Sequence, residues 1–560
     1  MKSKTLFLFL LFFIAISLNA QTVHDPNSGI YKDIDIWFIQ GYITDFLPMV
    51  RPYPVKLVNK LLDQVIENGD EIAQEKAAFY RAFFTPKGRA LYPGVEAYIQ
   101  GDEDERSILV SPYAEGAFFI GDLMNVSYNM SFHAFTKNGE HFNVPGTYSP
   151  YPDLVVDTAN IGRFTVLQNW TSLVSFGSSD VYFQAGLSRS SFGPFYDNGV
   201  VLGPQAPRAG HFSFMYWDPL YSFEVLFQTI VATDDFGYGV FPAKYNIIHS
   251  INFRPVNNLE LGVVQSLIYG ERIDPLYFVP FSFLFGSQTI NGFGDNALIG
   301  LHLRWKALND FLVNGQVYID DFSFNGILKG EPHFKAAGQL GFSFTPKSTI
   351  LSRLDFDYTA VLPYMYTHWP EPETNRYNGP DDPSNPKSLP IGIGGPRIPN
   401  YLNYTHMGRS LGTDLPPNSD RVLLKTNWRV FSNLQFNVSA YLTRHGNASA
   451  GRDYYDPEYH DGSIFDYGSI DPWLDPTDSP DAGWGNHLLN NFYKDIPFLT
   501  QSVIETKLGG TFGITWTLPS SFGIFKLTGD YGIQYGWNRR LVKDNNGINH
   551  FWSFGGIWSY

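Results

Sequence analysis

The feature that most constrains this chain is an alternation of apolar and polar residues over most of its length. From Met124 to Ala134 every second residue is apolar, and the residues between them are Asn, Ser or His. The same pattern recurs from Leu434 to Thr443 and from Ile299 to Lys306. Because successive side chains of a strand point to opposite faces, a period of two predicts β-strands with one apolar and one polar face. The chain from about residue 89 onward is therefore predicted to be all-β and antiparallel.

Such strands can form a soluble sandwich or a transmembrane barrel, and three features favour the barrel. Each alternating segment is about the 9–11 residues that a tilted strand needs to cross the hydrocarbon layer. Short turns alternate with much longer loops, as in outer-membrane barrels; the turns are Asn138-Gly139, Phe431-Ser432-Asn433 and Asn545-Asn546-Gly547. One face of the last segment is aromatic-rich and resembles the terminal-strand signal read by the outer-membrane insertion machinery; it carries Trp552, Phe554, Gly556, Trp558 and Tyr560. We predict that residues 89–560 form an outer-membrane β-barrel.

The first residues are typical of a secretory signal peptide. Lys2 and Lys4 precede an unbroken apolar stretch from Leu6 to Ile16, and Ala20 provides a small residue at the predicted cleavage site. The apolar stretch is shorter than the ~20 residues that a membrane-spanning helix needs. We therefore expect residues 1–20 to be removed on export to the outer membrane.

Residues 21–88 follow a different period. After Pro54, apolar residues recur every three or four positions, which predicts an amphipathic helix that Asn68-Gly69 ends. A second helix is expected from Glu71 to Phe84, and a third, short helix from Ile34 to Phe46. These helices are predicted to form a small unit on the periplasmic side of the barrel.

Charge and composition exclude several classes of protein. The formal net charge of −15 does not suit nucleic acid, whose phosphates require clustered Lys and Arg. The chain has no cysteine, which excludes disulfides and thiolate metal sites. Aromatic residues reach 17% of the chain, and Tyr and Trp have a physical role at a membrane interface.

A stretch without charged residues lies between Asp274 and Asp295. Prolines and polar residues interrupt it, so it is never apolar over the length that a membrane-spanning helix requires. We predict a strand followed by a loop in this region.

The two longest loops, roughly residues 363–420 and 453–498, are predicted to face the outside of the cell. Loops of this length in a compact fold are usually functional or disordered. Aromatic rings stack on the apolar faces of sugars, while polar side chains bind the hydroxyl groups. The loops therefore offer candidates for polysaccharide binding, namely Trp369, Tyr377, Tyr401, Trp473 and Trp484.

No motif makes a strong case for catalysis. Residues 408–412 match the nucleophile elbow G-x-S-x-G, but Pro416-Pro417 shortly after them forbid the helix that the elbow requires. If this stretch is extended, His406 and Ser410 lie roughly 13 Å apart, too far for a Ser–His pair. The Asp residues between 471 and 481 do not have the spacing of an EF-hand loop. We predict a chain that is not an enzyme, with no catalytic residues, no cofactor and no metal.

Several stretches together carry a family resemblance: Arg51-Pro52-Tyr53-Pro54, Asp320-Asp321-Phe322, Asn403 to Gly412, Pro416 to Leu424, and Thr443 to Gly446. In this order, after an export signal, they resemble the Wzi-type capsule assembly family over nearly the whole mature chain. The resemblance implies an 18-stranded antiparallel barrel with a helical bundle on its periplasmic side. It also implies a lectin-like role, in which the protein holds capsular or exopolysaccharide at the cell surface without chemistry.

Two alternative functions stay open at this point. One is an outer-membrane porin or substrate channel, and the other is an outer-membrane lipid hydrolase. An open lumen would favour the porin, whereas inward-pointing cations that meet Asp and Glu from other strands would plug it; the candidates are His302, Arg304, Lys306, Lys425 and Arg429. The expected partners are surface polysaccharide, outer-membrane lipid and the insertion machinery, with no nucleic acid, and the chain is expected to be a monomer.

Overall fold

The fold of the chain is that of a computed structural model. The structure describes residues 25–83, 90–102, 106–121, 123–136, 158–195, 197–231, 243–270, 272–291, 295–322, 334–347, 350–363, 365–366, 389–391, 395–397, 402–407, 409–431, 433–446, 498–501, 503–520 and 523–559. The predicted signal peptide, residues 1–20, lies outside these residues.

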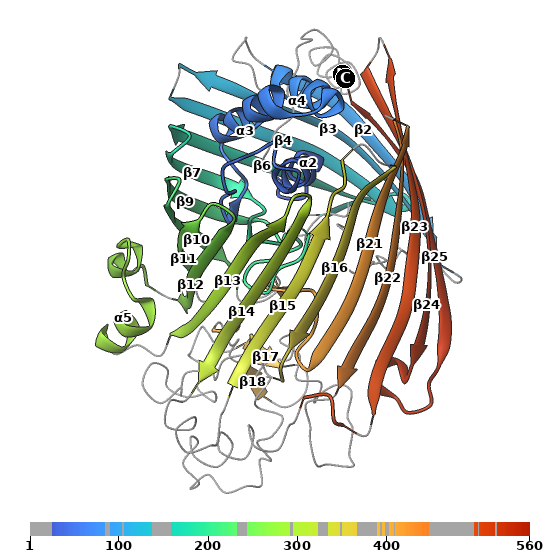
Figure 1. The fold of residues 1–560 in the computed structure, drawn as a ribbon. Helices are drawn as coiled ribbons and strands as arrows, with labels where there is room; N and C mark the ends of the chain where they lie inside the picture. Colours follow the sequence, from blue (N-terminus) through green and yellow to red (C-terminus); the bar gives the residue numbers. More distant parts are fainter. Residues whose placement is uncertain are drawn as a thin grey trace, which may run out of the picture.

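Eighteen antiparallel strands close into a barrel (Figure 1). In order around the wall they are β2 (Ala90–Gly101), β3 (Arg106–Ile120), β4 (Met124–Thr136), β6 (Phe164–Gly177), β7 (Val181–Ser188), β9 (Ala209–Trp217), β10 (Tyr221–Ile230), β11 (Lys244–Val256), β12 (Leu259–Gly270), β13 (Asn296–Leu308), β14 (Phe311–Phe322), β15 (Phe334–Phe344), β16 (Leu351–Val361), β21 (Ser419–Phe431), β22 (Leu434–Gly446), β23 (Ile504–Ser520), β24 (Gly523–Trp537) and β25 (Gly547–Ser559). The first and last strands pair from Gly94 with Ser559 onward, so the sheet has no open edge. The predicted all-β barrel is confirmed.

Shorter elements accompany the wall. Strand β5 (Thr158–Ile161) pairs with the first residues of β6, whereas β7 pairs with the last residues of β6. Three two-stranded pairs lie apart from the barrel sheet, formed by β1 (Val50–Arg51) with β8 (Ser191–Phe192), β17 (Leu389–Ile391) with β18 (Gly395–Arg397), and β19 (Thr405–His406) with β20 (Arg409–Ser410). One helical turn, η4 (Arg539–Leu541), joins β24 to β25.

The alternation of residues sorts the two faces of the wall as predicted. In β13, Leu301 is 62% exposed on the outside, while Arg304 on the other face is fully buried. In β22, Leu442 is exposed and its neighbour Tyr441 is buried. The apolar face therefore points outward, where lipid surrounds a barrel of this kind, and the polar face lines the lumen.

The two ends of the barrel differ in the lengths of their connections. At one end the turns are short, such as Gly121 to Leu123 and Ser178 to Asp180. The first residue of β2 and the last residue of β25 also lie at this end. Short turns are typical of the periplasmic side. Outward-facing Trp residues near the strand ends mark the membrane boundary on this side: Trp305, Trp428 and Trp516.

The predicted turns have different outcomes. Phe431 to Asn433 joins β21 to β22 at the periplasmic end, as expected of a short turn. Asn545 to Gly547 lies at the opposite end, within the longer connection between β24 and β25. Asn138-Gly139 falls outside the described residues.

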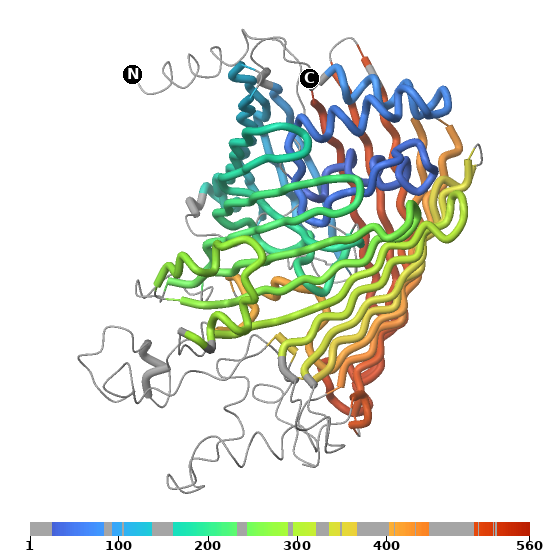
Figure 2. Tube along the Cα trace, turned by 60° about the vertical axis from the view of Figure 1, so that its left-hand side comes forward, coloured from blue at the N-terminus to red at the C-terminus, as the bar shows by residue number. Residues whose placement is uncertain are grey.

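The N-terminal helices lie at the periplasmic end (Figures 1 and 2). Helices α3 (Val55–Asn68) and α4 (Glu71–Phe83) match the two predicted helices. Helix α2 (Gly29–Ile39) begins and ends earlier than the predicted range of Ile34 to Phe46. The prediction was wrong at this boundary because Gly41, with a φ of 80°, turns the chain back and the amide of Tyr42 bonds to the carbonyl of Trp37.

The charge-free stretch corrects another prediction. Instead of a strand and a loop, it forms a short 3₁₀ helix, η1 (Pro275–Phe278), followed by α5 (Leu284–Asn291). Both lie against the outside of the barrel wall (Figure 1). Among the described residues, no helix combines the length and the apolar character needed to cross a membrane.

Candidate functional site

The interior of the barrel holds the N-terminal segment, and this occupied lumen is the candidate site. The Glu224 carboxylate on β10 accepts the backbone N–H of Met49 at 3.0 Å and that of Val50 at 2.6 Å. Arg304 on β13 donates to the carbonyl of Leu47 at 2.8 Å. Three barrel contacts thus fix three residues of a four-residue stretch, Leu47 to Val50, inside the wall, and they satisfy backbone groups that burial would leave unpaired.

A buried ion network surrounds this anchor. Glu260 on β12 accepts from Arg254 at 2.8 Å and lies 3.7 Å from Arg304, and none of the three side chains is more than 4% exposed. The guanidinium of Arg304 also lies 5.5 Å from the ring centre of Phe38 in α2. Such charges are tolerated inside a protein only when each has a partner, so the network depends on all its members.

Helix α2 is also bound to a neighbouring part of the wall, formed by β16 and β21. Arg353 on β16 forms an ion pair with Asp35 at 2.7 Å, and Lys32 donates to Asn427 on β21 at 2.6 Å. The apolar side of α2 packs in one cluster with α3 and with inward-facing Tyr182 and Leu312. The N-terminal unit therefore enters the lumen, and α3 and α4 lie across its periplasmic mouth.

A second insertion fills the half of the lumen nearer the long loops. The ammonium of Lys244 donates to the carbonyls of Asn403 and Thr405, each at 2.7 Å. Tyr404 donates to the carbonyl of Val201 at 2.8 Å, and its ring stacks on Tyr366 at 5.7 Å. Segments far apart in the sequence thus meet in one buried cluster inside the barrel.

The predicted inward cations have mixed outcomes. Arg304 does meet an acid from another strand, and Lys425 is paired with Asp197, although that residue lies in a loop. His302 bonds to the amide oxygen of Asn252 at 2.6 Å, and Lys306 lies 4.8 Å over the Phe38 ring. These two contacts are therefore to an amide and to an aromatic ring, not to an acid. Arg429 has no ion pair within the described part of the chain.

The reason given against a Ser–His pair in the 403–412 stretch was wrong in its geometry. The stretch is not extended: it folds into the β19–β20 hairpin, which pairs Thr405 with Ser410. Both ring nitrogens of His406 are nevertheless engaged by backbone, the amide of Val231 at 3.0 Å and the carbonyl of Arg208 at 2.9 Å. The His406 ring serves to hold the hairpin against the wall.

All five predicted polysaccharide-binding residues lie outside the described residues, namely Trp369, Tyr377, Tyr401, Trp473 and Trp484. The residues that anchor the inserted segments were not singled out from the sequence. The signal that marks them is a charged residue at a lumen-facing strand position, as with Glu224 in β10 and Lys244 at the start of β11.

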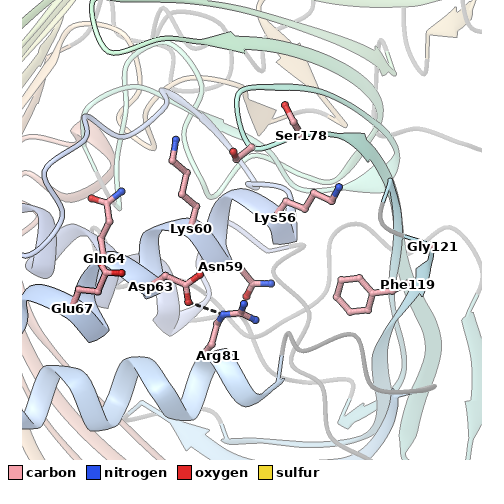
Figure 3. Close-up of a pocket in the computed structure, with 11 residues that line it drawn as sticks. Lys56, Asn59, Lys60, Asp63, Gln64, Glu67, Arg81, Phe119, Gly121 and Ser178 are labelled. Atoms are coloured by element: carbon pink, nitrogen blue, oxygen red, sulfur yellow. Dashed lines mark hydrogen bonds and ion pairs between the residues drawn. The ribbon is translucent and has the colours of Figure 1, made fainter.

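A groove of about 620 Å³ opens at the periplasmic rim, between α3 and the turns that follow β3 and β6 (Figure 3). Two of the cations that line it are paired with acids: Lys60 with Asp180 at 3.0 Å, and Arg81 with Asp63 at 2.8 Å. Lys56 donates to the carbonyl of Gly177. The bonds of Lys60 and Lys56 tie α3 to the rim of the barrel, and the Arg81–Asp63 pair joins α4 to α3.

Comparison with known proteins shows which solved structures have a similar fold. No protein-family model matches the sequence, and no curated protein matches it. Among solved structures, the chain is similar to Wzi of Escherichia coli, an outer-membrane protein involved in group 1 capsule assembly and described as a carbohydrate-binding β-barrel. The match covers 94% of this chain and 98% of Wzi, with a TM-score of 0.53 and 12% identity. The shared feature is the fold of an outer-membrane barrel.

Two further structures match less closely. OprD of Pseudomonas aeruginosa covers 85% of this chain and 97% of its own, with 9% identity and a TM-score of 0.40. The match to OccAB2 of Acinetobacter baumannii covers 84% of this chain and 98% of OccAB2, with 10% identity and a TM-score of 0.41.

Proposed function

We propose that this chain is a non-enzymatic outer-membrane protein that binds capsular or exopolysaccharide and helps to attach or assemble it at the cell surface. The observation that carries the proposal is the occupied lumen, in which Glu224 and Arg304 hold one segment and Lys244 holds another. A channel needs a free path through its lumen, whereas a binding protein needs a rigid frame that presents loops. The carbohydrate binding described for Wzi, which has the same fold, supports the same function.

The binding residues in this proposal are the aromatic residues of the long extracellular connections. Trp473 and Trp484 belong to an acidic loop, and Trp369, Tyr377 and Tyr401 belong to the other long loop, which is dense in Pro, Gly and Asn. Their rings would stack on sugar faces, and neighbouring amides and carboxylates would accept from hydroxyl groups. A signal peptide of residues 1–20, a periplasmic unit of residues 21–88 and a monomeric barrel of residues 89–560 belong to the same proposal.

The direct test is deletion of the gene, followed by separate measurement of cell-attached and shed polysaccharide. The expected result is an unchanged total amount with a larger shed fraction. Unchanged attachment would contradict the proposal. Binding of the purified protein to polysaccharide from the same cells, measured by calorimetry, gives an independent readout.

The porin alternative is tested by conductance. Purified protein in planar bilayers is expected to conduct poorly because the inserted segments occupy the lumen. Stable open channels under low voltage would favour the porin instead. The lipid hydrolase alternative would require release of fatty acids from phospholipid or lipopolysaccharide by the refolded protein, and we expect none.

A further inference from the structure

The connection between β12 and β13 folds back onto the outside of the barrel, where a second interaction surface can be recognised. We call residues 272–291 the outer-wall lobe; it contains η1 and α5. Phe281 stacks on Phe223 of β10 with 4.4 Å between the ring centres, and Phe278 lies 4.8 Å from Phe227. The connection starts at the extracellular end of β12, so the lobe extends from that end along the wall.

Polar contacts fix the lobe to the wall at two places, at its base and farther along the wall. At its base, Tyr277 donates to Asp295 at 2.6 Å, and Arg272 pairs with the same carboxylate. Farther along the wall, the Gln265 side chain donates to the carbonyl of Ser282 at 2.5 Å and accepts from the amide of Leu284 at 2.9 Å. Both hydrogen-bonding ends of an outward-facing glutamine are therefore satisfied by the lobe.

The wall beneath the lobe departs from the apolar pattern of its outer face. Gln265 on β12 and His249 on β11 both occupy positions between outward-facing apolar residues. His249 is only 2% exposed, and its ring lies 6.0 Å from that of Phe223. Polar side chains are costly in contact with hydrocarbon, so the lobe separates these two residues from the surroundings of the barrel.

The lobe itself has the polarity of a helix in lipid rather than in water. Its exposed side chains are large and apolar: Ile273, Leu276, Val279, Phe281, Phe283, Phe285 and Ile290. Ile290 is 83% exposed, while Ser287 on α5 is 8% exposed and bonds to the carbonyl of Phe283. No charged residue occurs between Asp274 and Asp295. A surface helix in water would place Ser287 outside and Ile290 inside.

We propose that the outer-wall lobe is embedded in the acyl chains of the outer leaflet and anchors this side of the barrel in the membrane. Its apolar side continues the outward-facing apolar surface of the adjacent wall, where Leu261, Val263 and Leu301 are exposed. The ion pair of Arg272 and Asp295 lies at the base of the lobe, beside the extracellular ends of β12 and β13, where the proposal puts the lipid head groups. An apolar face in the acyl region with a polar base at the interface is the arrangement of a membrane-anchoring helix.

The absence of cysteine from the chain permits a clean test by site-directed spin labelling. The variant Ile290→Cys carries the label on the lobe, Leu301→Cys on the lipid-facing wall, and Lys543→Cys in the exposed extracellular turn. Each is refolded into phosphatidylcholine vesicles. Collision of the label with oxygen, which concentrates in lipid, is compared with collision with a water-soluble nickel chelate.

The expected result is a ratio of oxygen to nickel collisions at position 290 that equals the ratio at position 301 and exceeds the ratio at position 543. A ratio at 290 equal to that at 543 would place the lobe in water and overturn the proposal. Low collision rates with both reagents would show that protein covers the lobe, a second copy for instance, and would overturn it as well. Resistance of each variant to unfolding in cold detergent confirms that the barrel has formed.

Discussion

The anchor of the N-terminal segment leads to a prediction about a single atom. Glu224 presents two carboxylate oxygens to two backbone donors, Oε1 to Met49 and Oε2 to Val50. The variant Glu224→Gln keeps the size and shape of the side chain but replaces one oxygen with an amide nitrogen. One of the two backbone N–H groups then faces another donor and loses its partner.

The magnitude follows from the number and kind of bonds. A hydrogen bond to a charged group contributes about 1.5–3 kcal/mol, and a neutral one about 0.5–1.5 kcal/mol. The substitution removes one charge-assisted bond and makes the other neutral, so docking of the segment weakens by about 3 kcal/mol. Since about 1.4 kcal/mol corresponds to a factor of ten, the undocked population rises about a hundredfold.

Hydrogen exchange measures this population directly, because an amide exchanges only when its bond opens. Peptides that contain Met49 and Val50 are expected to exchange about a hundredfold faster in Glu224→Gln. The matched control is Glu67→Gln, the same chemical change at an exposed position of α3, where no effect on these peptides is expected. Equal exchange of Met49 and Val50 in the wild type and in Glu224→Gln would refute the assignment of Glu224 as the anchor.

Three further predictions concern other parts of the chain. Gln265→Ala removes two bonds of about 1 kcal/mol each to the outer-wall lobe, so a spin label at Ile290 should become more mobile. Asp414→Asn removes one of the two bonds of 2.7 and 2.8 Å to Arg421 and makes the other neutral, and it should expose residues 409–418 to limited proteolysis. Burial alone would raise the pKa of Asp414, but Arg421 holds it below its ordinary value; the same protection should therefore persist above about pH 4 and be lost on further acidification. Trp484→Ala should weaken polysaccharide binding by roughly 1–2 kcal/mol, about tenfold, in calorimetry.

The predictions for Asp414 and Trp484 each have a control at an unrelated position. Asp544→Asn removes an exposed carboxylate of the extracellular turn and should leave proteolysis of residues 409–418 unchanged. Trp305→Ala removes an outward-facing ring near the periplasmic end and should leave polysaccharide binding unchanged. An unaltered line shape in Gln265→Ala, equal cleavage in Asp414→Asn, or full affinity in Trp484→Ala would contradict the respective argument.

The local sequence pattern was sufficient to predict the strands of the barrel wall and two of the helices. The alternation around Met124 and Leu301 states which side chain faces lipid, because the period of a strand is a property of the backbone. Helix α3 follows in the same way from its apolar stripe and from the residues at its ends. The closed sheet then satisfies every backbone group that the membrane would leave unpaired.

What fills the barrel and what covers it depended on contacts between distant residues. Lys244 and Thr405 are 161 positions apart, and Arg304 and Leu47 are 257 apart. Gln265 breaks the apolar pattern of its strand, but the residues near it in the chain do not indicate that the amide of Leu284 bonds to it. The sequence by itself determined a transmembrane barrel with helices at its entrance, since periodicity is local. Only the tertiary structure decided that the lumen is occupied and that one loop lies on the outer wall, because the polar groups involved find their partners through the closed fold.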